Sequence, residues 1–386
     1  MEFLEFFAGV FLGVIAGFLP GLHPNNISSV IAQLGMTNEG KTALLIGMFP
    51  ANLIASFVPA IFFGIPEGET VLAALPGQRM TLSGEGLTAL KTMLLSAIAA
   101  AFLSLLLFIP SMLMFPYLQS ALGGYIKYIV LVLAVVLVAR SKNMLTALLI
   151  FIAAGALGYF SLNSQMPDPF MPLFSGMFAI AALLNITGAK IPAQKKEGGF
   201  RKELLAFILL GVFLGMFADL LPGISSPAQV AFFATAAVPF NSLSYLATVS
   251  SIGVSQAIFS LATAATIGKS RIGTTAWLTQ FADVQQDALL LAVLFVFGAA
   301  LASVAVWLLR KKAANLAVLN ARPIGWLFIA YLALVCFLLD GWLGLLVLVL
   351  ASALGWLTLR LDVERTQMMG AVIVPTLLLL FGLTLF

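Results

Sequence analysis

The sequence has few charged residues, one cysteine and one histidine. Charged side chains make up 9% of its 386 residues, whereas apolar side chains make up 62%. A soluble domain carries roughly 25% charged residues, so this chain lacks the polar side chains to cover a water-exposed surface. The composition predicts an integral membrane protein. It excludes a soluble enzyme, a nucleic-acid-binding protein and a disordered chain.

The lone cysteine and histidine exclude further kinds of site. Cys336 cannot form an intrachain disulfide or a cysteine-based metal site, and His23 cannot form a histidine cluster. We therefore expect no metal site and no cofactor, with Na+ or H+ considered only as coupling ions. Glu2 and Glu5 stand where a signal peptide would carry basic residues, so the first apolar segment is expected to be retained.

Continuous apolar runs without barrel-type alternation predict membrane helices. The expected fold class is an all-α polytopic membrane bundle with broken or re-entrant helices. Some segments are shorter than the roughly 20 residues that a span needs, and these lie beside proline and glycine. Helices are expected at residues 3–19, 27–35, 41–63, 87–109, 111–122, 125–140, 143–160, 170–188, 203–221, 226–239, 243–266, 286–309, 323–339, 341–359 and 367–385.

An internal repeat divides the chain. GVFLGVIAGFLPGL at 9–22 and GVFLGMFADLLPGI at 211–224 share nine of fourteen positions without a gap. The repeat predicts a first membrane unit at 1–188, a basic linker at 189–202 and a second membrane unit at 203–386. Such duplication around broken helices is typical of secondary transporters. The start of the second unit is basic and that of the first is not, which favours inverted halves.

The linker also predicts orientation in a cell membrane. It contains five Lys or Arg residues, so the positive-inside rule makes residues 189–202 cytoplasmic. A patch that binds lipid head groups is the alternative. In the first helix, Gly9, Gly13 and Gly17 form a face of small residues, which is expected to pack closely against a neighbouring helix.

Each half contains a Pro-Gly interruption followed by polar residues. Proline breaks the helical hydrogen-bond ladder, and the next helix would begin with free N–H groups that suit an anion. Two such breaks could meet near the membrane midplane as an anion site, although simple proline kinks are the alternative. The candidate substrate-binding residues at the breaks are Pro20, Gly21, His23, Asn25, Asn26, Pro222, Gly223, Ser225 and Ser226.

Charged residues beside apolar helices are further candidates. Asp219 lies inside an apolar run, where a carboxylate is costly, so it could bind a coupling cation, carry a proton or form an ion pair. Lys269 and Arg271 are candidate cations for an anionic substrate, or they reach toward lipid head groups. Glu67 and Glu69 occupy the matching acidic stretch of the first half, as coupling or ion-pair residues.

The order of these motifs resembles the permease subunit family of tripartite tricarboxylate transporters, the TctA family, in its compact archaeal form. The resemblance rests on Leu-Pro-Gly-Leu at 19–22, Phe-Gly-Ile-Pro-Glu-Gly-Glu at 63–69, Pro-Gly at 76–77, Ser-Gly-Glu-Gly at 83–86, Ile-Gly-Lys-Ser-Arg at 267–271 and Arg-Thr-Gln-Met-Met-Gly at 365–370. It implies a multi-pass permease of two related halves that moves a carboxylate on an ion gradient, assisted by a binding protein and a small membrane subunit.

A second resemblance covers one octapeptide. Ala-Asp-Leu-Leu-Pro-Gly-Ile-Ser at 218–225 is similar to a signature of the polyprenyl-phosphate translocase family. That resemblance implies translocation of a lipid carrier phosphate. The leading hypothesis is a secondary transporter for a small organic anion rather than an enzyme, and the lipid translocase is the alternative. Expected partners are the anionic substrate, either carboxylate or lipid phosphate, and the lipid bilayer, with a second copy of the chain kept open.

Overall fold

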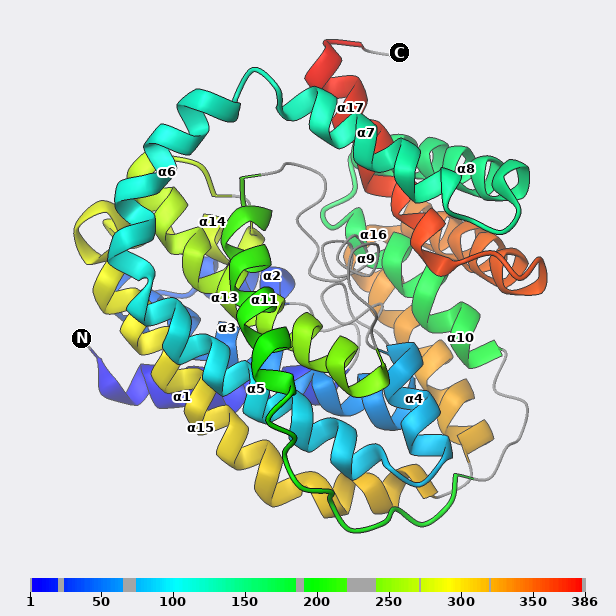
Figure 1. Ribbon diagram of the computed structural model, residues 1–386, viewed down its shortest axis with the longest axis horizontal. Coiled ribbons are helices and arrows are strands. Elements are labelled where there is room, and N and C mark those ends of the chain that lie inside the picture. The colour runs from blue at the N-terminus through cyan, green and yellow to red at the C-terminus, as the bar shows by residue number, and fades with distance from the viewer. Residues whose placement is uncertain are drawn as a thin grey trace.

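The protein is an assembly of helices, shown in Figure 1 as a computed structural model that describes residues 2–19, 24–64, 74–184, 191–220, 241–270, 272–318 and 321–383. In chain order the elements are α1 (Phe3–Phe18), α2 (Pro24–Gln33), α3 (Asn38–Ala55), the π-helix η1 (Pro59–Phe63), α4 (Ala74–Leu82), α5 (Gly86–Leu106), α6 (Phe108–Leu122), α7 (Ile126–Ala139), α8 (Met144–Leu162), α9 (Phe170–Phe174), the π-helix η2 (Ser175–Ile180), α10 (Ala181–Leu184), α11 (Leu204–Ala218), α13 (Ser242–Ile267), α14 (Gly273–Leu278), α15 (Val284–Val318), α16 (Ala321–Arg360), the 3-10 helix η3 (Arg365–Met369) and α17 (Gly370–Phe381). No strand occurs in these ranges.

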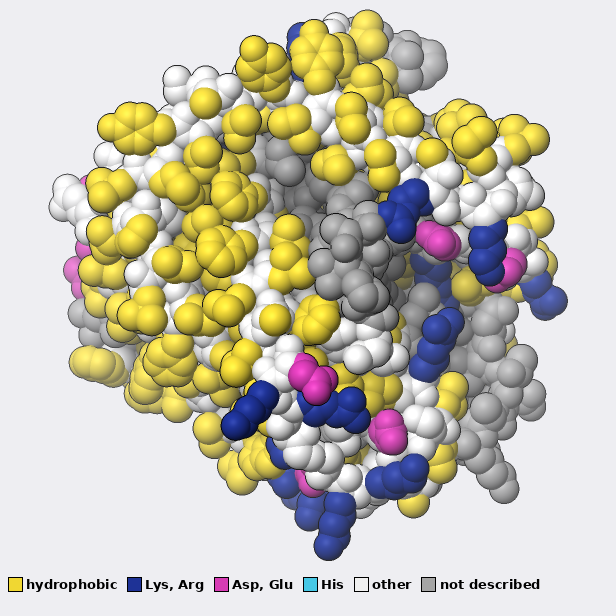
Figure 2. Space-filling view, viewed as in Figure 1, with side chains coloured by type: hydrophobic (Ala, Val, Ile, Leu, Met, Phe, Trp, Pro, Cys, Tyr) yellow, Lys and Arg dark blue, Asp and Glu magenta, His cyan; other side chains and the backbone are white. Residues whose placement is uncertain are grey.

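Six of the described helical segments are long and apolar enough to cross a membrane, and a seventh forms if α6 and α7, bent by 83°, count as one span. The six are Asn38–Phe63, Gly86–Leu106, Met144–Leu162, Ser242–Ile267, Val284–Leu316 and Gly325–Arg360. Large apolar side chains also cover much of the face in Figure 2, while Lys and Arg gather toward its lower and right parts. The expected all-α polytopic membrane bundle is confirmed.

The apolar interior has separate parts. The largest cluster joins residues of α1, α3, α5, α11, α13 and α15. A second cluster joins residues of α7, α8, η2, α16 and α17. In Figure 1, α7, α8 and α17 lie together at the upper right, away from α1 and α15 at the lower left. Segments Asn38–Phe63 and Ser242–Ile267 are 94% and 100% buried along their most apolar stretch, so α3 and α13 lie at the centre of the large cluster.

Glycines set the close approach of helices in this cluster. A Cβ added to Gly13 of α1 would lie 3.0 Å from the backbone nitrogen of Asn52 in α3. A Cβ added to Gly215 of α11 would lie the same 3.0 Å from the backbone nitrogen of Gln256 in α13. The glycine face of the first helix therefore packs as expected. The two helix pairs make matching contacts at these glycines.

The helix boundaries follow the sequence closely. Gly341, with φ of 64°, interrupts α16 between the two helices expected at 323–339 and 341–359. The short helices α4 and α14 are absent from the expectation because their polar composition gives no apolar run. The expected helix at 226–239 and residues 185–188 of the expected helix 170–188 lie outside the described residues.

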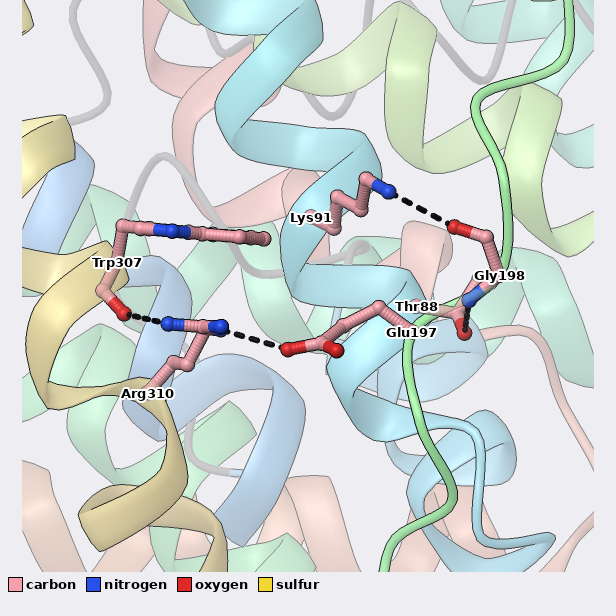
Figure 3. A network of polar contacts seen from close by, with 6 residues as sticks. All are labelled: Thr88, Lys91, Glu197, Gly198, Trp307 and Arg310. Carbon is pink, nitrogen blue, oxygen red and sulfur yellow. Dashed lines mark hydrogen bonds and ion pairs between the residues drawn. The ribbon is translucent and has the colours of Figure 1, made fainter.

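The described part of the linker, from Ile191 onward, runs across helix ends of both predicted halves (Figure 3). The Glu197 carboxylate accepts a hydrogen bond of 2.6 Å from Nε of Arg310 in α15. Lys91 of α5 donates to the carbonyl of Gly198, whose N–H donates to Thr88. The linker is thus held to α5 and α15 by specific contacts. The Arg310 hydrogen bond also holds the pKa of Glu197 below its usual 4.5.

Candidate functional site

The first helix break lies between α1 and α2. Helix α1 ends at Phe18, and the N–H of the capping residue Leu19 donates to the carbonyl of Ala16 at 3.0 Å; α2 begins at Pro24. Asn25 is half-buried in the first turn of α2, and its amide lies against Gly273 at the start of α14. A Cβ on Gly273 would lie 2.4 Å from Nδ2 of Asn25, so a larger residue there would displace the Asn25 amide. The structure therefore joins the first break to the stretch that follows the basic residues of the second half.

Several predicted residues of this break cannot be placed. Pro20, Gly21 and His23 lie outside the described residues, as does the side chain of Asn26. Of the residues predicted at the first break, the structure describes the side chain of Asn25 alone, together with the two helix ends.

The second break follows α11, which ends at Ala218 and is capped by Asp219. This carboxylate is 1% exposed and accepts a hydrogen bond from the Thr263 hydroxyl of α13. The same hydroxyl lies 3.0 Å from the carbonyl oxygen of Ser260. This hydrogen bond connects the end of α11 to the buried stretch of α13. The remaining predicted residues, namely Pro222, Gly223, Ser225 and Ser226, lie outside the described residues.

Buried amides at matching positions accompany the two breaks. Asn52 in α3 is 4% exposed and Gln256 in α13 is 1% exposed. Neither Nδ2 of Asn52 nor Nε2 of Gln256 has a hydrogen-bond partner in the described structure, and the Oγ atom of Ser260 also lacks one. Each amide residue packs its backbone on the glycine face of the helix that leads to a break, as given above for Gly13 and Gly215.

Sequence reasoning missed these amides because a single polar residue in an apolar helix does not reveal what it faces. A signal was nevertheless present. Asn52 and Gln256 are separated by 204 residues, close to the repeat spacing of 202 between Gly13 and Gly215. Polar residues that recur within two residues of the repeat spacing inside apolar helices are therefore a signal for such buried amides.

The second polar stretch is only partly described. Each predicted half has a long helical segment that ends on a left-handed glycine, Gly64 after η1 with φ of 64° and Gly268 after α13 with φ of 63°. Lys269 is exposed and makes no hydrogen bond or ion pair with any residue that the structure describes, Asp219 included. Glu67, Glu69 and Arg271 lie outside the described residues. The side chain of Gln78 in α4 lies directly against Gly64.

The described polar groups supply two kinds of chemistry. Amide N–H and hydroxyl groups without acceptors can donate to the oxygens of an anion, and such bonds are strong where water is excluded. A buried carboxylate with a hydroxyl beside it can accept a proton or contribute oxygen ligands to a cation. Within the described ranges, no three His, Cys, Asp or Glu side chains gather as a metal site would require.

These features define a class: an all-α, multi-pass membrane protein whose buried polar groups lie beside interrupted helices. The comparisons with known proteins give the family. The profile of the tripartite tricarboxylate transporter TctA family matches residues 3–370, and the chain belongs to this family. An uncharacterized protein of Methanocaldococcus jannaschii is 28% identical over 286 residues, covering 71% of each chain. Because this relative is archaeal, it is consistent with the expected resemblance to the compact archaeal form of the TctA family. No solved structure matches the chain.

Proposed function

We propose that the chain is a secondary active permease for a small organic anion such as a carboxylate, driven by an Na+ or H+ gradient. Membership of a family of tricarboxylate transporters supports transport of this substrate class. The observation that carries the proposal is the pair of buried amides, Asn52 and Gln256, whose N–H groups lack acceptors. Their backbones pack on the glycine faces of the helices that lead to the two breaks. Carboxylate oxygens are acceptors that such donors can bind.

Coupling is assigned to Asp219. The carboxylate lies where α11 is interrupted, and its Thr263 partner belongs to the central helix α13. Adding or removing a cation or proton at this position changes the charge at a helix end in a low-dielectric interior. Occupancy of the position would then bias the two halves toward one arrangement, and transport would proceed by alternating exposure of the anion site.

The predicted residues outside the described ranges keep their proposed roles. The Pro-Gly breaks, with His23, Asn26, Ser225 and Ser226, would complete the anion site, and Arg271 would contribute positive charge. Lys269 is a weaker part of the site because it is exposed. Glu67 and Glu69 stay candidates for coupling or ion pairing. We also propose the two homologous halves and a cell-membrane location with residues 189–202 facing the cytoplasm.

We also propose two further subunits as partners, a substrate-binding protein and a small membrane subunit, since the family is named for tripartite transporters. A second copy of the chain is a further proposed partner. The proposed activity is transport without covalent change of the substrate, so the protein acts as a carrier rather than an enzyme.

Reconstituted vesicles test the proposal. Uptake of labelled carboxylates is measured with an imposed Na+ or H+ gradient, and separately as exchange without a gradient. We expect gradient-driven accumulation with the native protein. Asp219→Asn should lose accumulation but keep exchange, because the amide preserves shape and removes the titratable charge. Asp340→Asn, a buried carboxylate in a different cluster, is the matched control and should accumulate normally. Normal accumulation by Asp219→Asn would remove the coupling role.

A further inference from the structure

The short 3-10 helix η3 (Arg365–Met369) begins with consecutive polar residues that are buried. Arg365 is 8% exposed, Thr366 is 6% exposed and Gln367 is fully buried. The helix packs on α8 and α7, and its Met368 and Met369 belong to the second apolar cluster. An arginine remains charged at any ordinary pH, so its burial among apolar side chains requires compensation.

The residues that the structure describes do not supply that compensation. Nε of Arg365 and Oγ1 of Thr366 are buried without a hydrogen-bond partner. The Arg365 guanidinium makes no hydrogen bond, ion pair or ring contact with any residue that the structure describes. The exposed carboxylates of Asp362 and Glu364, on the loop just before it, make no ion pair with it.

Arg310 is an arginine of the same chain whose charge and N–H donors are satisfied by neighbouring residues. Its Nε donates to Glu197, its Nη1 donates to the carbonyl of Trp307, and its guanidinium stacks 3.7 Å above the Trp307 ring, as Figure 3 shows. Each kind of contact that holds Arg310 is lacking at Arg365. The comparison indicates that Arg365 is completed by a group from outside the chain.

The backbone around Arg365 is held in place. The Gln367 amide donates 2.8 Å to the carbonyl of Leu137 in α7. A Cβ on Gly370 would lie 2.2 Å from the carbonyl oxygen of Phe151 in α8, so η3 and α17 press directly on that helix. Contacts with α7 and α8 therefore fix the turn that carries the donors of Arg365 and Thr366, and a binding site requires such fixed donors.

We propose that Arg365 and Thr366 form a second anion site, which binds a phosphate or carboxylate group. A guanidinium presents several N–H donors that match the oxygens of such a group, and a hydroxyl adds a further donor. The group comes either from a lipid head group or from a soluble anion. The site lies on the cluster of α7, α8 and α16, whereas Asp219 and Gln256 lie on α11 and α13 of the other cluster. It therefore lies in a different part of the apolar interior from the proposed transport site.

Thermal unfolding of the purified full chain in a neutral detergent, in phosphate-free buffer, tests the proposal. The probes are phosphatidylglycerol against phosphatidylcholine for the lipid source, and inorganic phosphate or citrate for the soluble source. A group that binds the folded state alone raises Tm, and the rise grows with the logarithm of its concentration relative to its Kd. We compare the native chain with Arg365→Gln and with Arg360→Gln, an exposed arginine five residues earlier that serves as the matched control.

The Tm of the native chain should rise with phosphatidylglycerol or with a soluble anion. The probe that raises Tm identifies whether the bound group comes from a lipid or from a soluble anion. Arg360→Gln should keep that shift. Arg365→Gln should bind at least about tenfold more weakly, since it loses a charge-assisted contact, and its ligand-free Tm should not fall. Asp219→Asn should keep the shift, which separates this site from the transport site.

The absence of any anion-dependent shift in the native chain would overturn the proposal, as would an unchanged shift in Arg365→Gln. A lower ligand-free Tm with an unchanged shift would make Arg365 a structural residue. If Arg365→Gln does not fold, Arg365→Lys and Thr366→Val replace it. Each should bind more weakly than the native chain, and normal anion binding by both would contradict the proposal.

Discussion

Gly9 is the position where close helix packing makes the sharpest stability prediction. A Cβ added to Gly9 in α1 would lie 2.1 Å from the carbonyl oxygen of Leu44 in α3. Carbon and oxygen atoms in close contact normally stay about 3.3–3.6 Å apart. In Gly9→Ala the two helices must therefore separate locally by about 1 Å. Because the obstacle is backbone rather than a flexible side chain, a change of rotamer cannot relieve it.

The magnitude follows from two opposing effects. Forcing an extra methyl group into a packed interior costs about 1–3 kcal/mol. Alanine is favoured over glycine inside a helix by up to about 1 kcal/mol. A backbone clash of this size belongs near the upper end of the packing cost. Gly9→Ala should therefore lower the free energy of unfolding by about 1–2 kcal/mol.

Gly325→Ala is the matched control for this substitution. Gly325 is also a buried helical glycine, in α16, but the nearest atom to an added Cβ is Cδ2 of Leu183 at 3.7 Å, an ordinary contact. This variant should be unchanged or stabilised by up to about 1 kcal/mol. Both variants are unfolded with denaturant in detergent micelles and compared with the native chain. Equal stability of the two variants would refute the reasoning from helix packing.

The remaining predictions concern polar contacts. Thr263→Val should impair gradient-driven uptake by removing the hydroxyl that holds Asp219, whereas Thr266→Val, one turn on, should leave uptake intact; vesicle flux measures both. Gln256→Leu should raise the substrate concentration needed for half-maximal uptake, and an unchanged concentration dependence would exclude it from the anion site. Glu197→Gln should cost up to about 1 kcal/mol of stability at pH 7. Because the folded pKa of Glu197 is lowered, its contribution is present above pH 4.5 and is lost as the pH falls below that value, so the two chains should converge in acid.

The sequence predicted the helical architecture well, because proline, glycine and apolar run length act locally. The α1 boundary, the glycine face of that helix and the interruption of α16 at Gly341 all follow from residues close together in the chain. The family was likewise predicted from the order of its motifs, which extend along most of the sequence.

The polar interior could not be predicted in the same way, because burial depends on segments far apart in the sequence. Asn52 and Gln256 look like isolated polar residues until α3 and α13 are placed at the centre of the bundle. Arg365 was recognised only as part of a family motif, and its burial depends on contacts with α7 and α8. Lys269 is the opposite case: the sequence predicted it as a residue of the anion site because of its charge, but it is exposed at a helix end.

One uptake measurement with two cargoes tests the proposed function most directly. Vesicles containing the purified chain are given a labelled small carboxylate or a labelled polyprenyl phosphate, each with and without an imposed Na+ or H+ gradient. We predict that the carboxylate accumulates above the level of protein-free vesicles only when the gradient is present. Translocation of the lipid phosphate without any carboxylate accumulation would contradict the proposed permease and favour a lipid translocase.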